Sequence, residues 1–387
     1  MQGFYTDCRE VWYNSKVMAK KVFKTIGKVF AYIFTFIAVL VLTTYLLLLM
    51  LCKGDAPATT RTFVPTMLET GALKFVVNLV LTEEEILAYT TADNAGEVID
   101  DVDTSLIAVT TTDGKETAET VHEEMTLIDS LEDPDGDGII YVPISGHTFG
   151  AALLIVRDPS KVSIASIYPF SSAEKDKYGI TIEQFVNNTG SIAGINAGEF
   201  VVDGTNWGGR PLGVVVSHGE IQFNAPGYGD VMIGFNEDNV LVIKELSGMS
   251  ADAFAAYVEE NHIRDAVTFK DVSDGNNNHF TKLIINGEAV DLGGKGVGAN
   301  PRTAIGQCAD GTVLLLVTDG RGSAGHLGAT AQDLIGVMQM YGAVNAANLD
   351  GGGSSSLYFD GEYKICTTFL PSAGNSKYLP TAFVVTQ

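Results

Sequence analysis

Two acidic residues each follow a stretch that is typical of a buried strand. Asp319 follows the apolar run 313–317 after one threonine and opens the triplet Asp-Gly-Arg, whereas Asp350 precedes three glycines and three serines. Turns at strand ends are where rigid scaffolds usually carry functional side chains. Two carboxylates at neighbouring strand ends would suit glycosidic cleavage, which commonly pairs an acid with a base or nucleophile. The sequence does not fix their separation, so the anomeric outcome stays open.

The same region has residues suited to binding an anion. Arg302 follows Pro301, whose ring fixes its own backbone φ, and a guanidinium there could grip two phosphate oxygens. The alternative interpretation of Arg302 is an ion pair inside the fold. Arg321 is a second candidate cation on the Asp319 turn. The glycines after Asp350 could direct backbone N–H groups at an anion, and the serines could add donors.

The order of these motifs resembles the phosphodiester glycosidase family. The matching stretches are 300–306 (Asn-Pro-Arg-Thr-Ala-Ile-Gly), 319–321 (Asp-Gly-Arg), 328–330 (Gly-Ala-Thr) and 348–355 (Asn-Leu-Asp-Gly-Gly-Gly-Ser-Ser). Several motifs in the right order are far more specific than any one alone. One loop departs from the pattern, because 196–200 reads Asn-Ala-Gly-Glu-Phe where family members more often have Asn-Gly-Gly-Phe/Tyr-Phe.

The resemblance implies a hydrolase, similar to alpha-N-acetylglucosaminidases, that cleaves a sugar-1-phosphate diester on the sugar side. The products would be free sugar and a phosphomonoester, and the substrate a phosphodiester-linked glycan such as a cell-surface glycopolymer. It implies Asp319 and Asp350 as catalytic residues. The substrate-binding residues that it implies are Asn196, Arg302, Thr303, Arg321, Asn348, Gly351, Gly352, Ser354 and Ser355.

A rival interpretation comes from a different functional class. The residues by themselves support only an anion-binding site with carboxylates. A non-catalytic surface module that binds anionic glycans or assists exopolysaccharide assembly would keep the arginines, but it would not need both Asp319 and Asp350.

Charge narrows the range of partners. The 387 residues carry a net charge of −23, with six Lys/Arg and two Asp/Glu in residues 1–52 and 18 and 45 in the remainder. Such acidity argues against a nucleic-acid partner, because phosphate binding needs a basic surface. Any site for an anionic substrate must therefore be a local basic island. Nothing in the sequence indicates an oligomeric state.

The N-terminal segment predicts a membrane anchor. Residues 29–52 contain no charged side chain, and their 24 positions exceed the roughly 20 that a helix needs to cross a bilayer. The basic segment 1–28 precedes this span, so the positive-inside rule places 1–28 in the cytoplasm and the rest outside the cell membrane. Two alternatives are a buried core helix and a cleaved signal peptide, whose apolar region usually has only about 7–15 residues.

The remaining sequence predicts a spacer followed by a catalytic domain. Residues 53–138 indicate a linker and an acidic spacer, with a helix over 79–89 that Thr82 caps and Glu85 completes as a capping box. Residues 139–387 predict an α+β phosphodiester glycosidase-like domain with a mixed sheet. Its clearest predicted elements are strands at 139–144, 151–156 and 313–317, helices at 250–261 and 334–341, and a hairpin at Asn286-Gly287.

One acidic loop could bind calcium. Asp133, Asp135 and Asp137 are spaced two apart with glycine at position six, as at the start of a calcium loop, but Ile144 stands at position twelve where Glu is expected. The alternative is an acidic turn before a strand. No other metal-binding spacing is present, so no cofactor is expected to be required. Cys308 and Cys366 could pair if exported or remain free thiols.

Overall fold

The structure is a computed structural model, and its contacts divide the chain into two units, Met1–Thr60 and Arg61–Gln387. It describes residues 2–54, 57–69, 74–82, 84–86, 101–109, 127–170, 178–202, 207–274, 277–367 and 376–387.

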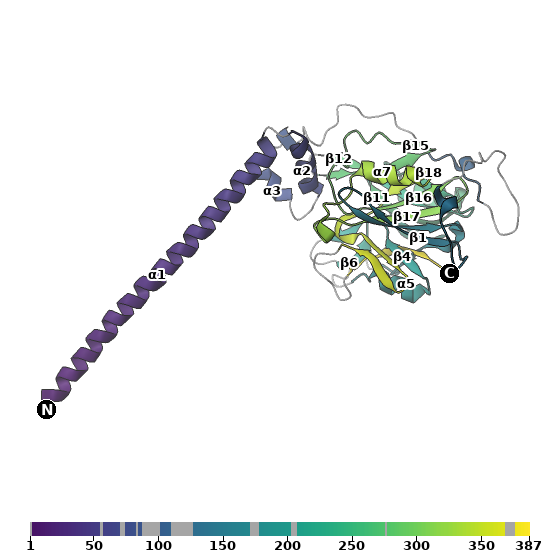
Figure 1. Cartoon of the computed structure of the whole chain (residues 1–387). Helices are drawn as coiled ribbons and strands as arrows, with labels where there is room; N and C mark the ends of the chain where they lie inside the picture. The colour runs from purple at the N-terminus through teal and green to yellow at the C-terminus, as the bar shows by residue number, and fades with distance from the viewer. Residues whose placement is uncertain are drawn as a thin grey trace. The chain divides into compact units, whose positions relative to one another are not determined.

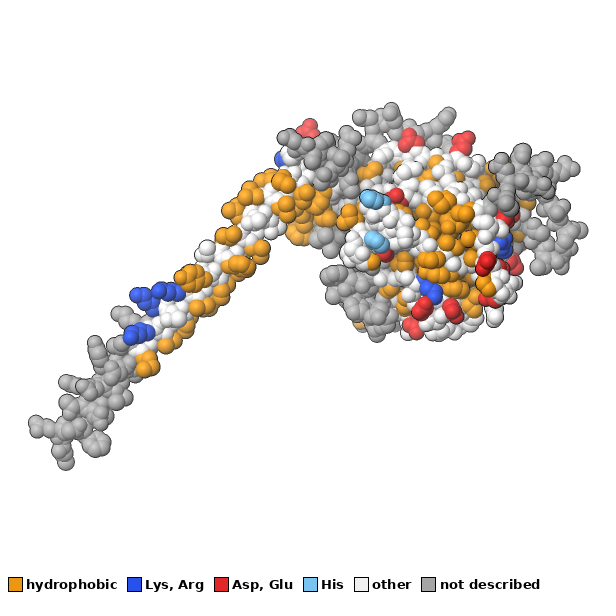
Figure 2. Space-filling model, in the orientation of Figure 1, with side chains coloured by type: hydrophobic (Ala, Val, Ile, Leu, Met, Phe, Trp, Pro, Cys, Tyr) orange, Lys and Arg blue, Asp and Glu red, His pale blue; other side chains and the backbone are white. Residues whose placement is uncertain are grey.

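The first unit is dominated by one long helix, α1 (Gln2–Lys53). Its segment Lys21–Lys53 has a mean hydropathy of 2.6 in the most apolar window, none of which is buried within the protein. Figure 2 shows hydrophobic side chains along this helix beyond a cluster of basic ones. The hydroxyls of Thr35, Thr43 and Thr44 donate to carbonyls one turn earlier, as polar groups in an apolar helix should. The exposed apolar surface contradicts the core-helix interpretation and fits a membrane span or a signal sequence.

The second unit is built from three main sheets (Figure 1), and this confirms the α+β class. The first sheet has the order β1 (Ile139–Ser145), β2 (Gly150–Val156), β17 (Val313–Thr318), β16 (Thr303–Cys308), β18 (Ala343–Asn348), β14 (Lys282–Ile285) and β15 (Glu288–Ala289). The second has β10 (Leu241–Glu245), β9 (Asp230–Asn236), β11 (Ile263–Lys270), β7 (Gly213–Ser217) and β8 (Glu220–Ala225). The third has β20 (Glu362–Cys366), β19 (Ser356–Phe359), β4 (Ala193–Asn196), β21 (Thr381–Val385) and β3 (Val162–Ser166).

Two short pairs complete the strands, β5 (Phe200–Val202) with β6 (Trp207–Pro211) and β12 (Val272–Asp274) with β13 (Asn277–His279). Among the strands that the structure describes, every pairing within the three main sheets is antiparallel, where the sequence suggested a mixed sheet. Antiparallel neighbours can be joined by short turns and need no crossover helix. The predicted hairpin at Asn286-Gly287 is one such turn, and both residues have positive φ.

The strands of the first sheet are buried on both faces. Leu314 and Leu316 of β17 pack in one apolar cluster with α7 (Ala331–Met340), whereas Leu315 and Val317 point into a second cluster shared with the other two sheets. Successive side chains of a strand point to opposite faces, so a strand covered on both sides needs an unbroken apolar run. This explains why residues 313–317 are apolar throughout. Thr330 begins α7 with a capping box to Asp333.

Further α-helices lie in this part of the chain, and α2 (Pro57–Glu69) crosses the boundary between the two units. α5 (Ile182–Thr189) and α6 (Ala251–Glu260) begin at the caps Thr181 and Ser250, and α3 (Lys74–Asn78) lies in the predicted spacer. The predicted capping box is present, because Thr82 N donates to Glu85 and Glu85 N donates to Thr82 Oγ1. Residues 87–100 of the predicted helix 79–89 and spacer lie outside the described residues.

The predicted spacer is partly integrated into the domain. Lys244 forms an ion pair with Asp101 at 2.8 Å, Asp103 N donates to Asn286 Oδ1, and Ala108 N donates to Ala309 O. Residues 101–109 therefore lie against the first and second sheets, and the compact unit begins well before residue 139. These contacts depend on the tertiary fold, which the polar composition of the segment does not reveal.

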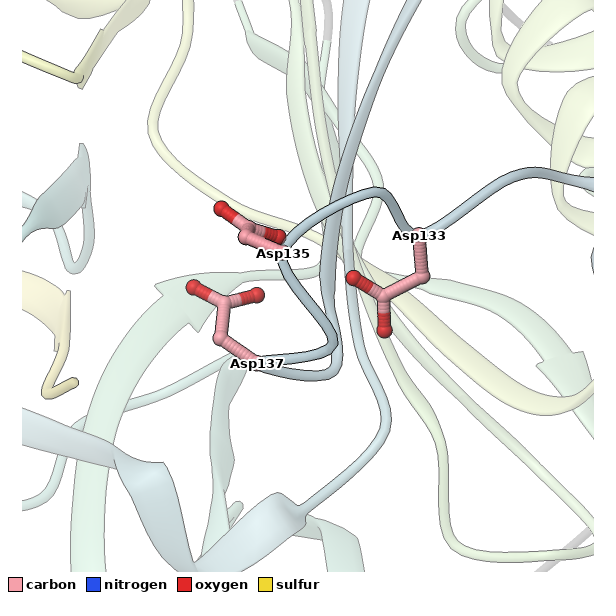
Figure 3. A group of neighbouring side chains, drawn as sticks. All are labelled: Asp133, Asp135 and Asp137. Atoms are coloured by element: carbon pink, nitrogen blue, oxygen red, sulfur yellow. The ribbon is translucent and has the colours of Figure 1, made fainter.

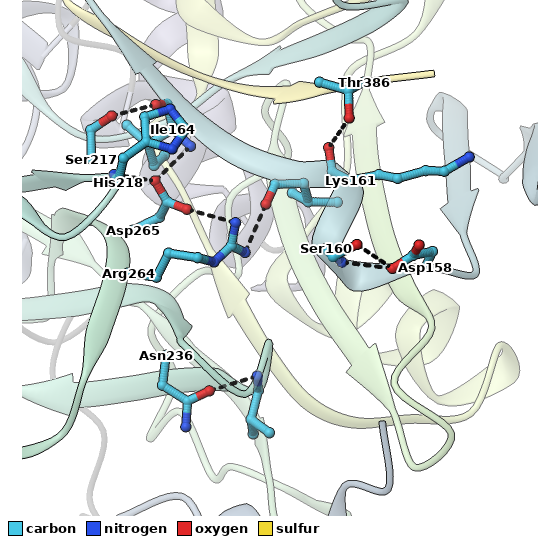
Figure 4. Close-up of polar contacts among 12 residues, drawn as sticks. Asp158, Ser160, Lys161, Ile164, Ser217, His218, Asn236, Arg264, Asp265 and Thr386 are labelled. Atoms are coloured by element: carbon cyan, nitrogen blue, oxygen red, sulfur yellow. Dashed lines mark hydrogen bonds and ion pairs between the residues drawn. The ribbon is translucent and has the colours of Figure 1, made fainter. Parts of the chain in front are cut away.

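A buried ion pair joins the second and third sheets (Figure 4). Asp265 has no exposed surface, and one of its oxygens accepts from the backbone N–H of Ile164 on β3 and of His218 after β7. The other lies 3.0 Å from the Arg264 guanidinium, which also donates to Val162 O. Burial of a carboxylate is tolerated here because every charge has a nearby partner.

Candidate active site

Four strands of the first sheet meet at one edge. β17 ends at Thr318, β16 begins at Thr303 and β18 ends at Asn348, because each strand runs antiparallel to its neighbour. β2 begins at the same edge, beside Thr318. Arg302 and Thr318 exchange hydrogen bonds, from Arg302 N to Thr318 Oγ1 at 2.9 Å and from Thr318 N to Arg302 O at 2.8 Å. The motifs of Arg302, Asp319 and Asp350 therefore leave the sheet at the same edge.

The loop after β18 carries Asp350 from the first sheet to the third. Asn196, the last residue of β4, holds this loop through its side chain. Its Nδ2 donates to Asp350 O at 2.5 Å, and its Oδ1 accepts from Thr303 Oγ1 at 2.7 Å and from Ser356 N at 3.1 Å. Asn196 is only 1% exposed, so its amide positions the predicted site residues Thr303 and Asp350.

Buried polar atoms without a partner surround this loop. Asn348 donates from Nδ2 to Phe280 O, but its Oδ1 has no partner among the described residues, and neither does Ser355 Oγ. Glu199 Oε2, on the bend that follows Asn196, is unpaired in the same sense. Buried polar groups are almost always hydrogen-bonded in proteins, so such a cluster indicates a place where water or a ligand completes the bonds.

Arg302 occupies a buried position under the loop. It is 8% exposed, its Nη2 donates to Gly298 O at 2.8 Å, and its Nε donates to Ala329 O at 3.3 Å. The guanidinium carbon lies 5.0 Å from the centre of the Phe280 ring. These carbonyl bonds were not anticipated from sequence, and they give Arg302 a structural role beside any contact with an anion.

Two further cations line the Asp350 loop. Gly352 lies so close to Arg321 that an added Cβ would stand 2.8 Å from Arg321 Nη2, which explains a glycine with φ 63° at this position. Partial burial over the loop and the neighbouring Arg302 lower the pKa of Arg321, and Asp350 opposes this, although much of the residue stays exposed. On the other side, Lys377 Nζ donates to Ser354 Oγ at 3.2 Å and lies 4.6 Å from the Phe200 ring centre.

Asp350 itself is half-buried among these groups. Burial raises the pKa of the Asp350 carboxyl, whereas Lys377, Ser354, the N–H of Gly351 and Arg321 act in the opposite direction. The carboxylate accepts from Gly351 N at 3.0 Å. Arg321, Lys377 and the serine hydroxyls thus surround a carboxylate on a glycine-rich loop, the arrangement expected where an anion and a reacting bond are held together.

Asp319 has a different set of partners. Its carboxylate accepts from Gly150 N at 2.7 Å and lies 2.8 Å from His326 Nδ1. Both partners are on the β2 side of β17, away from β18. The structure thus joins Asp319 to His326, and strand β16 separates the ends of β17 and β18 that carry Asp319 and Asp350.

Another carboxyl group, that of Glu199, is affected by the charge of Asp350. Burial raises the pKa of Glu199 from the ordinary 4.5 to about 7, with Lys270 opposing and Asp350 and Asp230 adding to the rise. Glu199 stands in the 196–200 loop, where family members more often have Phe or Tyr, whereas Lys377 lies outside the motifs that the family resemblance supplied. The acidic residue in 196–200 was the one signal for Glu199, whereas no local pattern distinguishes Lys377.

The acidic loop at 133–138 lies apart from these residues in sequence and precedes β1. Figure 3 shows the carboxylates of Asp135 and Asp137 side by side, with Asp133 facing them across the turn. One oxygen from each of the three lies within 4.8 Å of the others. Both oxygens of Asp133 accept backbone N–H groups, from Gly136 and Gly138. The loop is thus held by hydrogen bonds between its own residues, and Ile144 at position twelve lies within strand β1.

Comparison with known proteins identifies the family. The family model described as phosphodiester glycosidase matches residues 189–386, just over half of the chain. The chain belongs to the phosphodiester glycosidase family. All the motifs with the predicted site residues fall inside the matched region. Membership places the chain among glycosidase-type hydrolases, as the sequence resemblance implied.

Individual relatives are more distant. A solved structure of the zebrafish N-acetylglucosamine-1-phosphodiester alpha-N-acetylglucosaminidase catalytic domain, auto-inhibited by its pro-peptide, is 20% identical, with a TM-score of 0.48 over 64% of this chain and 82% of that chain. A protein from Burkholderia pseudomallei is 15% identical, with a TM-score of 0.42 over 62% and 74%. The SPbeta prophage-derived uncharacterized protein YomE of Bacillus subtilis is 45% identical over 64 residues, 16% of this phosphodiester glycosidase and 10% of that relative's length.

The two cysteines that could have paired are not joined to each other. Cys308 is buried and donates to Tyr341 O, whereas Cys366 is partly exposed beside Ser356.

Proposed function

We propose that this phosphodiester glycosidase hydrolyses a sugar-1-phosphate diester on the sugar side, releasing free sugar and a phosphomonoester. The observation that carries the proposal is the group of three cations, Arg302, Arg321 and Lys377, at the Asp350 loop of a protein with a net charge of −23. An acidic protein repels anionic ligands in general, so a local cluster of cations needs a specific explanation.

The chemistry of the loop suits a phosphodiester. Guanidinium groups bind phosphate oxygens bidentately, and an ammonium adds a point charge that follows the anion. Ser354 and the unpaired hydroxyl of Ser355 can complete the hydrogen bonds of the bound phosphate. In this proposal Asp350, among these donors, takes part in the reaction at the sugar carbon that carries the phosphate. No cofactor is needed for this reaction in our proposal.

We also propose that the enzyme is anchored in the cell membrane by residues 29–52, with the catalytic domain outside. The apolar helix α1 and the basic residues that precede its most apolar part support this orientation. A phosphodiester-linked glycan at the cell surface is the substrate that such a location would supply.

The test is product analysis with a defined panel. The full-length protein in detergent is incubated with the methyl phosphate diesters of N-acetylglucosamine-1-phosphate, glucose-1-phosphate and galactose-1-phosphate. We expect free sugar and methyl phosphate in equal amounts from at least one of them. If none is cleaved but one binds in an Arg321-dependent manner, the protein is a glycan-binding module and the hydrolase proposal fails.

A further inference from the structure

The bend after β4 brings a second acidic residue to the Asp350 loop. Asp350 N donates to Ala197 O at 3.2 Å, and two residues later Glu199 N donates to Thr268 O on β11 at 2.9 Å. Gly198 passes so close to β11 that an added Cβ would stand 2.9 Å from the Val267 side chain. The Asp350 loop and strand β11 are thus each hydrogen-bonded to this bend within two residues of Ala197. These bonds fix Glu199 beside the loop.

The neighbours of Glu199 belong to the site already described. Phe200, the next residue, packs under the Lys377 ammonium, which in turn donates to Ser354. The charged groups that act on Glu199 are Lys270 on β11, Asp350 on the loop and Asp230 on β9. Asp230 is 2% exposed and accepts from Gly227 N, so its carboxylate is already engaged.

One oxygen of the Glu199 carboxyl, Oε2, is buried and accepts no hydrogen bond from the residues that the structure describes. An ionised oxygen in that position would lack the bonds that stabilise a buried charge, so the protonated form is favoured, and the pKa rises to about 7. A protonated carboxyl there can donate its hydrogen to a bound ligand.

Burial raises the pKa of both carboxyls, but Asp350 has more partners for its anion. Lys377 and Arg321 face it, and Gly351 N and Ser354 bond to it, whereas Glu199 has only Lys270 as a favourable charge. Two coupled carboxyls titrate as a unit, and the proton resides on the one with less support for its anion. Asp319 is bonded to Gly150 and His326, on the side of β17 that faces β2.

We propose that Glu199 is the catalytic proton donor of this site, acting with the Asp350 carboxylate as base. The inference rests on the proposed function. The oxygen of a water molecule bonds to the sugar C1, and the bond from C1 to the phosphate oxygen breaks with its electron pair leaving on that oxygen. The departing oxygen takes the proton of Glu199, and Asp350 takes the proton released by the water. Exchange with solvent then restores both groups.

The test compares Glu199→Gln and Glu199→Ala with the wild-type full-length protein on the methyl phosphate diester that it cleaves fastest. We expect kcat of Glu199→Gln to fall by about 100- to 10,000-fold with little change in KM. The decline of wild-type kcat/KM as pH rises through about 7 should disappear in that variant. Formate, a small carboxylic acid, should restore part of the activity of Glu199→Ala. The matched control is Glu220→Gln, at the exposed start of β8, which should behave as wild type.

The outcomes separate the two proposals. Undiminished kcat and an unchanged pH profile in Glu199→Gln would overturn the assignment of Glu199 while leaving the proposed function intact. A loss of activity that formate does not restore, accompanied by a lower melting temperature, would show a structural role and overturn it as well. If the wild type cleaves no diester of the panel, the proposed function itself fails, and the inference fails with it.

Discussion

Arg302 and Arg321 bring two cations to the same sheet edge, but they are held differently. Arg302 is buried and bonded to backbone carbonyls, whereas Arg321 is exposed and stands over Gly352. From sequence, Arg302 was the first candidate for binding an anion and Arg321 the second. Their difference depends on Gly298 and Ala329, whose carbonyls only the folded chain places around Arg302.

We predict that Arg321→Ala lowers kcat/KM about 30- to 1,000-fold, by analogy with the 2–4 kcal/mol lost on removing one oxyanion donor. Its melting temperature should stay at the wild-type value, because the side chain is exposed. Arg302→Ala should lose activity and stability together, since two buried carbonyls lose a donor. Arg157→Ala, at the opposite end of β2, is the control. Wild-type kcat/KM in Arg321→Ala would remove Arg321 from the site.

Glu199 should also make the free energy of unfolding depend on pH, which urea unfolding at a series of pH values measures. The unfolded chain loses this proton near pH 4.5 and the folded chain near pH 7, so the folded state holds more protons in between and the free energy of unfolding falls as pH rises through that window. The loss is on the order of 3 kcal/mol, since one pKa unit corresponds to about 1.4 kcal/mol. Glu199→Gln should therefore be more stable than wild type at pH 8, and a variant less stable there would contradict this.

Some residues of the candidate site can be identified from the sequence and others cannot. Asp350, Arg302 and Arg321 could be singled out because they stand in motifs with glycine, proline or strand ends. Lys377 could not, because it is 27 positions beyond Asp350 in sequence and meets Ser354 only through the third sheet. The expected pairing of Asp319 with Asp350 followed from their similar contexts, and only the strand order shows that Asp319 faces β2.

Strands with apolar runs were predictable, and strands with polar buried residues were not. Residues 313–317 indicate β17 directly, whereas β16 contains Thr303, Gln307 and Gly306, which pattern rules score poorly. Gln307 is fully buried and bonds to the backbone of Leu241, Asn239 and Gly311. β11 carries the half-buried Arg264 and the buried Asp265 side by side, which has no counterpart in an alternating pattern.

The ion pair on β11 predicts a large loss of stability. Asp265→Ala would leave the Arg264 guanidinium and two backbone N–H groups without their acceptor, so we expect the free energy of unfolding to fall by about 3–5 kcal/mol. Urea unfolding measures this, with Glu237→Ala in an exposed ion pair as the control expected to change it by less than about 1 kcal/mol. A loss as small as that of the control would mean that Asp265 contributes little to joining the sheets.

The acidic loop before β1 is predicted to act as a turn. Asp133→Ala should lower the free energy of unfolding by about 1 kcal/mol, the usual worth of a capping side chain, because Gly136 and Gly138 lose their acceptor. A chelator should leave the melting temperature of the wild type unchanged. If the chelator lowers the melting temperature and Asp135→Ala abolishes that response, the loop is a calcium site after all.

At the scale of the whole molecule, the uneven charge and the apolar helix predict the topology. A reporter fused after Gln387 that is active only outside the cytoplasm should be active in intact cells, because the basic residues before the span favour the cytoplasmic side. The purified protein should retain residues 1–28. A reporter active only in the cytoplasm would contradict the orientation, and a mature chain that begins after Cys52 would show that the helix is a cleaved signal.

The central claim is that water attacks the sugar carbon and not the phosphorus. Hydrolysis of the methyl phosphate diester of N-acetylglucosamine-1-phosphate, or of the panel member cleaved fastest, in water enriched in the heavy isotope of oxygen distinguishes the two by mass spectrometry of both products. A glycosidase places the heavy oxygen in the anomeric hydroxyl of the sugar and leaves methyl phosphate unlabelled. Heavy oxygen in a phosphate-containing product, with an unlabelled sugar moiety, would mean attack at phosphorus and would contradict the account.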